Sequence, residues 1–291
     1  METQKYKPAI YQIAIAVPGI ADDIFDQIID LVKWWPEDLE GERPGPGVEF
    51  TLRAGEDHYS KNKVIDFEPG KRFAWITTES LRKTDGFEWT GTKMIFDLVA
   101  TNATTQITYT YDGIVLADEV ERLVHICQLT VKELLYNYLV HGKTKDDFSL
   151  AIEFNKSAGV VFNALTKDVA RWWGGRDLTG SALKLHDEFS IGHPGAHYSK
   201  QQVIELVHDE RLVWLVTESE LAWLQQDKHE WTGTKMIFWL SGNNGKTELR
   251  FTHVGLTRDK ECYETCSHSG WGIVISDYLY LFVSEGKPHF T

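Results

Sequence analysis

The chain has few cysteines, fewer basic than acidic side chains and no long apolar run. Three cysteines (Cys127, Cys262 and Cys266) are too few, and odd in number, for a disulfide framework, so a reducing cytoplasm is the expected compartment. The 30 Lys and Arg against 43 Asp and Glu leave a net charge of −13, with no basic cluster. Nucleic acid is therefore not an expected partner, because phosphate binding needs clustered Lys and Arg.

Membrane insertion is not expected either, because no apolar stretch approaches the roughly 20 residues that span a bilayer. The first ten residues, METQKYKPAI, also lack the charged-then-apolar order of a signal peptide. No nucleotide-binding loop, serine-hydrolase motif or zinc-protease motif stands in a plausible context. Cys262 and Cys266 lack the second ligand pair that a zinc site needs, and are expected to be buried thiols. We expect neither a metal nor a cofactor.

What the sequence does contain is an internal repeat. The nine residues EWTGTKMIF occur at 88–96 and again at 230–238, an offset of 142 (230 − 88). An identical nonamer in so short a chain indicates a duplicated unit, and predicts two domains, residues 1–143 and 144–291. Nearly the same offset repeats HYSK (58–61 and 197–200), TES (78–80 and 217–219) and a tryptophan pair (34–35 and 172–173).

Each unit has the pattern strand, helix, several strands and a long helix. In the first unit, residues 10–17 alternate as a strand does and residues 20–32 have helical apolar spacing. Asp118 and Glu121 form a capping-box pattern before a long amphipathic helix that Gly142 ends. This order predicts an α+β fold in which a curved antiparallel sheet wraps around the C-terminal helix. Such a wrap leaves a cavity unless side chains fill it.

The same order resembles a known family. The tryptophan pair after the first helix, EWTGTKMIF on a late strand and THVG at 252–255 are similar to the heat-shock protein 90 ATPase activator C-terminal-like family, within the START/SRPBCC helix-grip superfamily. The second unit carries the resemblance best, in TELRFTHVGL (247–256) and ECYETCSHSGW (261–271), whereas the first unit has TYTYDGIVL at 108–116. The resemblance implies two tandem helix-grip domains with an apolar cavity, and no single activity.

Candidate cavity residues are aromatic and polar side chains expected in the interior. In the second unit, His253 and Phe251 alternate on one strand face and Trp271 lies on the closing helix. The hydroxyls of Thr232 and Thr234, placed on one face of a strand, could fix a polar ligand atom, while the alternative is that all these residues fill a solid core. The full candidate set is Trp173, Trp214, Thr232, Thr234, Phe251, His253, Trp271 and Tyr278, with first-domain equivalents Trp35, Trp75, Thr90, Thr92, Tyr109 and Tyr111.

Three functions remain open from the sequence. The first is a non-catalytic binding protein whose cavity, mainly in the second domain, holds a small hydrophobic or aromatic molecule. The second is a co-chaperone-like module that modulates a heat-shock chaperone ATPase, and the third is a cyclase- or hydrolase-type enzyme using the cavity. Tyr111 stands where the second unit has His253, so the two units share no acid–base pair. This favours binding over catalysis.

Overall fold

The computed structural model describes residues 6–174, 177–193, 195 and 197–290. The chain divides into two compact units, Met1–Lys145 and Asp146–Thr291. The boundary expected from the sequence lies slightly earlier, after residue 143. The two units are described one at a time.

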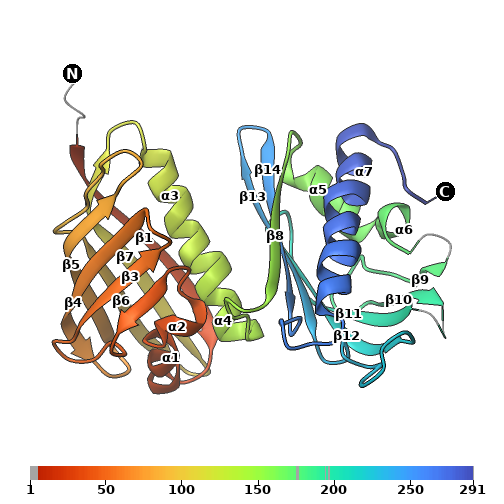
Figure 1. Ribbon diagram of the computed structural model, residues 1–291, viewed down its shortest axis with the longest axis horizontal. Coiled ribbons are helices and arrows are strands. Elements are labelled where there is room, and N and C mark those ends of the chain that lie inside the picture. The colour runs from red at the N-terminus through yellow and green to blue at the C-terminus, as the bar shows by residue number, and fades with distance from the viewer. Residues whose placement is uncertain (1–5, 175–176, 194, 196, 291) are drawn as a thin grey trace. The chain divides into compact units, whose positions relative to one another are not determined.

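The first unit is a seven-stranded antiparallel sheet with a long closing helix (Figure 1). Strand β1 at one edge pairs with β7, the last strand of the meander, so that the sheet order is β1-β7-β6-β5-β4-β3-β2. The closing helix contains a π-helical segment, η1, between its two α-helical parts. The elements are β1 (Tyr6–Pro18), α1 (Ala21–Ile28), α2 (Leu31–Trp34), β2 (Asp38–Gly41), β3 (Glu49–Ala54), β4 (His58–Glu68), β5 (Arg72–Arg82), β6 (Lys93–Thr101), β7 (Thr104–Leu116), α3 (Val120–Gln128), η1 (Leu129–Leu135) and α4 (Tyr136–His141).

The second unit repeats this plan, with sheet order β8-β14-β13-β12-β11-β10-β9. Its closing helix has two π-helical segments, η3 and η4, before the α-helical end. The elements are β8 (Phe148–Phe154), α5 (Ala158–Thr166), α6 (Val169–Trp172), β9 (Thr179–Gly180), β10 (Glu188–His193), β11 (His197–Val207), β12 (Arg211–Leu221), β13 (Lys235–Asn243), β14 (Lys246–Val254), η3 (Thr265–Gly272), η4 (Val274–Leu279) and α7 (Tyr280–Glu285).

The duplication extends to irregularities of the sheets. Strands β4 and β5 lose register between Lys61 and Asn62, and β11 and β12 lose it between the equivalent Lys200 and Gln201. Both closing helices also end at a glycine in the left-handed conformation, Gly142 and Gly286, which satisfies the last helical carbonyls. The fold class predicted from the sequence is confirmed: two tandem α+β domains, each an antiparallel sheet with a long C-terminal helix.

Two predictions about the helices of the first unit are wrong. The helix expected over residues 20–32 is broken into α1 and α2, because Asp30 has a non-helical backbone (φ −84°, ψ 61°). The capping box is absent as well: the residue that caps α3 is Glu119, and no side chain bonds the first turn. The carboxylate of Glu119 instead accepts a hydrogen bond from the guanidinium of Arg122.

The threonine pairs are not on strands, contrary to the sequence prediction. Thr90 and Thr92 flank Gly91 in a tight turn before β6, where the glycine adopts φ 90°. The two hydroxyls therefore do not share a strand face, and Thr90 is exposed while Thr92 is buried. Thr232 and Thr234 flank Gly233 (φ 85°) in the equivalent turn of the second unit.

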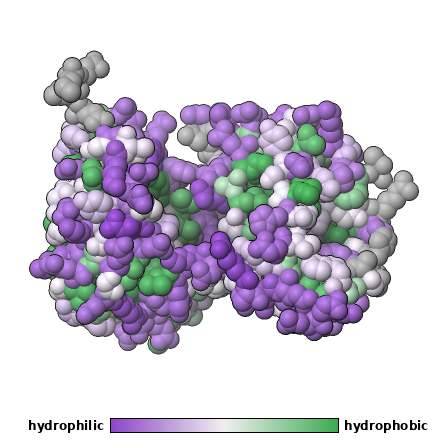
Figure 2. Space-filling model, viewed as in Figure 1, coloured by the Kyte–Doolittle hydropathy of each residue, from purple (hydrophilic) through white to green (hydrophobic). Residues whose placement is uncertain are grey.

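Each unit buries its own aromatic-rich core. The cores include Phe25, Phe73 and Trp75 in the first unit, and Trp172 and Phe238 in the second. The face drawn in Figure 2 is mostly hydrophilic, with hydrophobic residues in small groups. Among the described residues, no helix is long and apolar enough to cross a membrane.

Candidate ligand cavity

In the second unit, the predicted cavity residues pack against one another. Trp271 of the closing helix is 2% exposed, and its ring centroid lies 4.9 Å from that of Trp173 and 4.6 Å from that of Phe251. Trp173 in turn stacks on Trp214 at 5.9 Å, with the rings 8° from parallel. The indole of Trp271 thus occupies the space between the helix and the sheet.

His253 is a hydrogen-bonded core residue in this cluster. The indole N–H of Trp271 donates to Nδ1 at 2.9 Å, so Nε2 carries the proton and lies 2.9 Å from the hydroxyl of Thr234. Burial lowers the pKa of His253 to about 3, which keeps the imidazole neutral. A neutral imidazole with both nitrogens engaged serves packing and not proton transfer.

The remaining two second-unit candidates take no part in these contacts. Thr232 is exposed, and its hydroxyl lies 2.9 Å from that of Ser219. Tyr278 is partly buried against the same hydrophobic core and stacks on His289, with ring centroids 3.4 Å apart. Six of the eight predicted residues therefore form one packed cluster.

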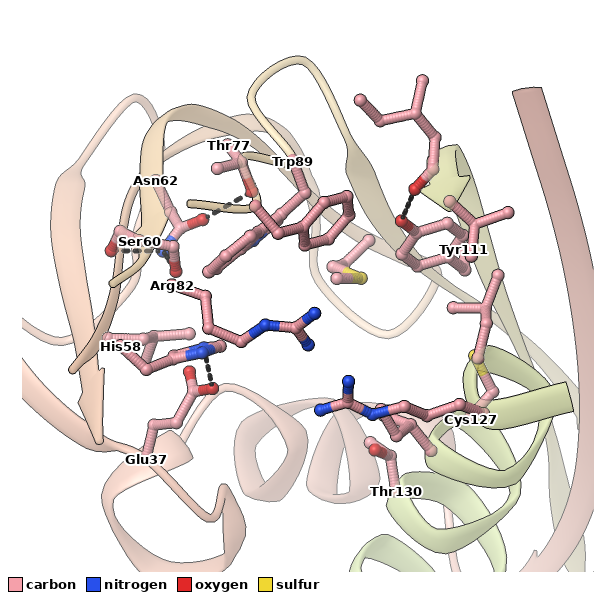
Figure 3. A pocket seen from close by; sticks show the side chains of 18 of the residues that line it. Glu37, His58, Ser60, Asn62, Thr77, Arg82, Trp89, Tyr111, Cys127 and Thr130 are labelled. Atoms are coloured by element: carbon pink, nitrogen blue, oxygen red, sulfur yellow. Dashed lines mark hydrogen bonds and ion pairs between the residues drawn. The ribbon is translucent and has the colours of Figure 1, made fainter. Parts of the chain in front are cut away.

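A cavity lined wholly by described residues lies in the first unit. Its volume is about 200 Å³, and its walls come from strands β3 to β7, the turn before β6 and the closing helix (Figure 3). The sequence had favoured the second unit for the ligand site. The lining residues are Trp35, Glu37, Leu52, His58, Ser60, Asn62, Trp75, Thr77, Arg82, Phe87, Trp89, Met94, Tyr109, Tyr111, Ile114, Val115, Glu119, Arg122, Leu123, Ile126, Cys127 and Thr130.

One position on the closing helix explains why the space between helix and sheet is open in the first unit and filled by an indole in the second. Cys127 lies 15 residues before the terminal Gly142, and Trp271 lies 15 residues before Gly286. Both are buried, and each faces the sheet of its unit. Since cysteine is much smaller than tryptophan, the volume that the indole fills in the second unit is left open beside Cys127.

Four of the six first-unit candidates line this cavity: Trp35, Trp75, Tyr109 and Tyr111. The hydroxyl of Tyr111 donates to the backbone oxygen of Ile114 at 2.6 Å, and that of Tyr109 to the sulfur of Met94 at 2.9 Å. Burial raises the pKa of both phenols, so both stay neutral. The other two candidates, Thr90 and Thr92, are not among the lining residues.

Several polar lining residues were missed from the sequence. Asn62 and Thr77 face each other across β4 and β5, and the Thr77 hydroxyl donates to Asn62 Oδ1 at 3.0 Å. The Asn62 amide donates to the Ser60 hydroxyl at 3.0 Å. In the second unit the pair is Gln201 and Val216, and within the described residues Gln201 Oε1 has no hydrogen-bond partner. The threonine thus completes a polar strip specific to the first unit.

An imidazole–carboxylate pair lies on the wall. His58 Nε2 lies 2.8 Å from Glu37 Oε1, and the His58 ring stacks on Trp89 with centroids 4.6 Å apart. Trp35 Nε1 donates to the second oxygen of Glu37 at 3.3 Å. The Glu37 carboxylate thus holds the orientation of the His58 imidazole on the cavity wall. His197 matches His58, but the position matching Glu37 is a glycine outside the described residues.

Two arginines border the cavity. Arg82 ends β5, and its Nε donates to both carboxylate oxygens of Asp85, at 2.9 and 3.0 Å. Arg82 Nη2 is 3.3 Å from each oxygen of Glu119, which also accepts from Arg122 Nη1 at 2.8 Å. Arg82 holds the pKa of Asp85 at about 2, so this carboxylate stays ionised. The network joins the end of β5 to the start of α3.

The cavity has no activated nucleophile. Burial raises the pKa of the Cys127 thiol to about 12, so it remains protonated at neutral pH. In the second unit, Cys262 and Cys266 are buried as expected, and the neighbouring Cys262 raises the pKa of Cys266. Among the described residues, no group of three or more His, Cys, Asp or Glu side chains could hold a metal ion. The arrangement is suited to holding a mainly apolar molecule with a few polar anchors.

Comparison with solved structures finds similar chains of low identity. The solution structure of the Aha1 dimer from Colwellia psychrerythraea is 19% identical with a TM-score of 0.39, covering 48% of this chain and 98% of that one. DynU16, a putative protein in the dynemicin biosynthetic locus, is 15% identical (TM-score 0.38; 92% and 96% covered). The di-domain ARO/CYC StfQ of the steffimycin biosynthetic pathway is 12% identical (TM-score 0.35; 84% of each chain).

No curated protein matches the chain. One family model does, the Activator of Hsp90 ATPase homolog 1-like protein, over residues 155–280. The match spans most of the second unit, where the sequence resemblance is strongest. The first unit has the same strand order and the same nonamer, and is a diverged copy. Residues 155–280 of the second unit are therefore similar to the Activator of Hsp90 ATPase homolog 1-like family.

Proposed function

We propose that the first unit is a non-catalytic binding module that holds a small hydrophobic or aromatic molecule between its sheet and its closing helix. The observation that carries the proposal is the difference between Cys127 and Trp271 at the same place in two copies of one fold. A volume of about 200 Å³ beside Cys127 is lined by Trp35, Trp75 and Tyr109. Ligand sites are commonly such aromatic-walled cavities with a few polar groups.

The test uses N-phenyl-1-naphthylamine, a neutral probe whose fluorescence rises in apolar surroundings. The full chain should bind it, and Cys127→Trp, which introduces the residue of the second unit, should abolish the binding. Cys127→Ala leaves the space open and serves as the matched control. Circular dichroism shows whether each variant is folded. If Cys127→Trp does not fold, Leu123→Phe narrows the same cavity from the next turn of the helix. Undiminished binding by a folded, blocked variant would refute the proposal.

A second candidate concerns the second unit. The family match covers residues 155–280, and the interior of this unit is packed around Trp271. We propose as the alternative that this unit modulates a heat-shock chaperone ATPase through its outer surface. Stimulation of the chaperone ATPase should then persist in Cys127→Trp, because that change leaves the second unit intact. Absence of stimulation at a molar excess of the chain would remove this candidate.

A further inference from the structure

The cavity of the first unit has a charged end, and the described residues of the second unit have no arginine at the matching strand position. Arg82 pairs in register with His58, whereas the equivalent His197 pairs with Leu221. The Arg82 side chain is only 15% exposed, and Figure 3 shows its guanidinium reaching into the cavity. Partial burial of a charged side chain costs free energy unless the charge is paired. The presence of Arg82 where the second unit has Leu221 therefore calls for a structural or functional explanation.

Ion pairing within the protein accounts for part of the reason that Arg82 and Arg122 lie here. The carboxylates of Asp85 and Glu119 neutralise the two guanidiniums and tie the end of β5 to α3. These two carboxylates do not accept from every N–H group of the two arginines. In the described part of the chain, no hydrogen bond is made by Arg82 Nη1 or by Nε and Nη2 of Arg122. Both arginines line the cavity, so these N–H groups are available to a molecule inside it.

The unpaired N–H groups of Arg82 and Arg122 indicate which chemical group of a ligand would bind here. A guanidinium presents a planar set of N–H donors that matches the two oxygens of a carboxylate. The body of the ligand would lie on the aromatic wall formed by Trp35, Trp75 and Trp89. A neutral, wholly apolar ligand would leave the arginine donors without acceptors once water is displaced, which is unfavourable.

We propose that the ligand of the first unit is an aromatic carboxylic acid whose carboxylate accepts hydrogen bonds from Arg82 and Arg122. This proposal rests on the binding function above and adds the chemical class of the ligand. Arg82, which is mostly buried and fixed by its ion pairs, supplies one N–H donor. Arg122 of α3, which is half exposed, supplies a second N–H donor.

The test is displacement of N-phenyl-1-naphthylamine by 2-naphthoate and by 2-naphthamide, which share a ring system and differ in charge. Because charge-assisted hydrogen bonds are the stronger ones, 2-naphthoate should displace the probe at a concentration about tenfold lower. That ratio should fall to about one in Arg82→Leu, which installs the residue of the second unit, and in Arg122→Gln, which changes a half-exposed side chain. Arg53→Gln, on β3 outside the cavity, should retain it.

The outcomes separate this proposal from the binding function. If the probe does not bind, or binds equally to folded Cys127→Trp, the binding function itself fails. If the probe binds in the cavity but the two naphthyl compounds displace it equally, the ligand is neutral and the carboxylate proposal is overturned. The same holds if both arginine variants keep the tenfold preference. If Arg82→Leu does not fold, the result for Arg122→Gln decides.

Discussion

A single histidine in the second unit shows what burial does to a titratable group. His253 accepts from the Trp271 indole and has a pKa of about 3, against an ordinary value of 6.5. Its folded-state pKa is depressed, so the unfolded chain binds more protons between these two values. The stabilising contribution of neutral His253 is therefore complete above pH 6.5 and is lost as the pH falls toward 3.

We predict that His253→Gln weakens this pH dependence. Glutamine offers an acceptor to Trp271 and a donor to Thr234 without titrating in this range. In urea unfolding at several pH values, the wild-type free energy of unfolding should fall more steeply below pH 6.5, by up to about 1.4 kcal/mol per pH unit. Parallel curves for wild type and His253→Gln would contradict the prediction.

Among the elements, strands β4 and β5 differ from β11 and β12 at one hydrogen bond. Thr77 donates to Asn62 Oδ1 in the first unit, and Val216 leaves Gln201 Oε1 without a partner among the described residues of the second. Thr77→Val should therefore cost about 1–3 kcal/mol, because it leaves a buried acceptor unsatisfied. The matched change Val216→Thr should cost less, or stabilise. Urea unfolding measures both, and equal costs would show that the hydrogen bond is immaterial.

The sequence predicted these elements better than the site between them. The period of the apolar residues, the repeated nonamer and the glycine stops were enough to predict two sheets, each with a closing helix. Helix α1 was extended too far because apolar spacing continues through Asp30, where the backbone turns out of the helix. The Thr-Gly-Thr segments predict strands because threonine is common in strands, whereas the left-handed conformation of Gly91 and Gly233 makes them turns.

The first-unit cavity was harder to predict for a different reason. The resemblance to the family is strongest in the second unit, where Trp271 fills the space beside the closing helix. The informative signal was the set of differences between the copies, above all Arg82 for Leu221 and Cys127 for Trp271. Those differences were readable in the sequence once the register was known. The register itself depends on the paired bulges of the two sheets, which the offset of the nonamer alone does not give.

At the scale of the whole molecule, duplication supplies two copies of one fold that differ beside the closing helix, where Cys127 borders a cavity and Trp271 fills the equivalent space. We predict that the chain binds N-phenyl-1-naphthylamine with one site per molecule, because Trp271 occupies the matching volume of the second unit. Calorimetric titration of the full chain gives the stoichiometry. Two equivalent sites would show that the second unit also admits the probe.

The reciprocal change tests the same idea from the filled copy. Trp271→Cys installs the first-unit residue in the second unit, and should lower the free energy of unfolding by about 3–5 kcal/mol, as large-to-small core changes do. The space made this way is walled mainly by aromatic rings, with His253 Nδ1 as its polar group, and should accept the probe, so the stoichiometry should rise from one to two. In Cys127→Trp combined with Trp271→Cys, one site should remain, now in the second unit. It should show no preference for 2-naphthoate over 2-naphthamide, because Leu221 stands where the first unit has Arg82. A folded Trp271→Cys variant that still binds one probe, with little loss of stability, would contradict the filled-core account of Trp271.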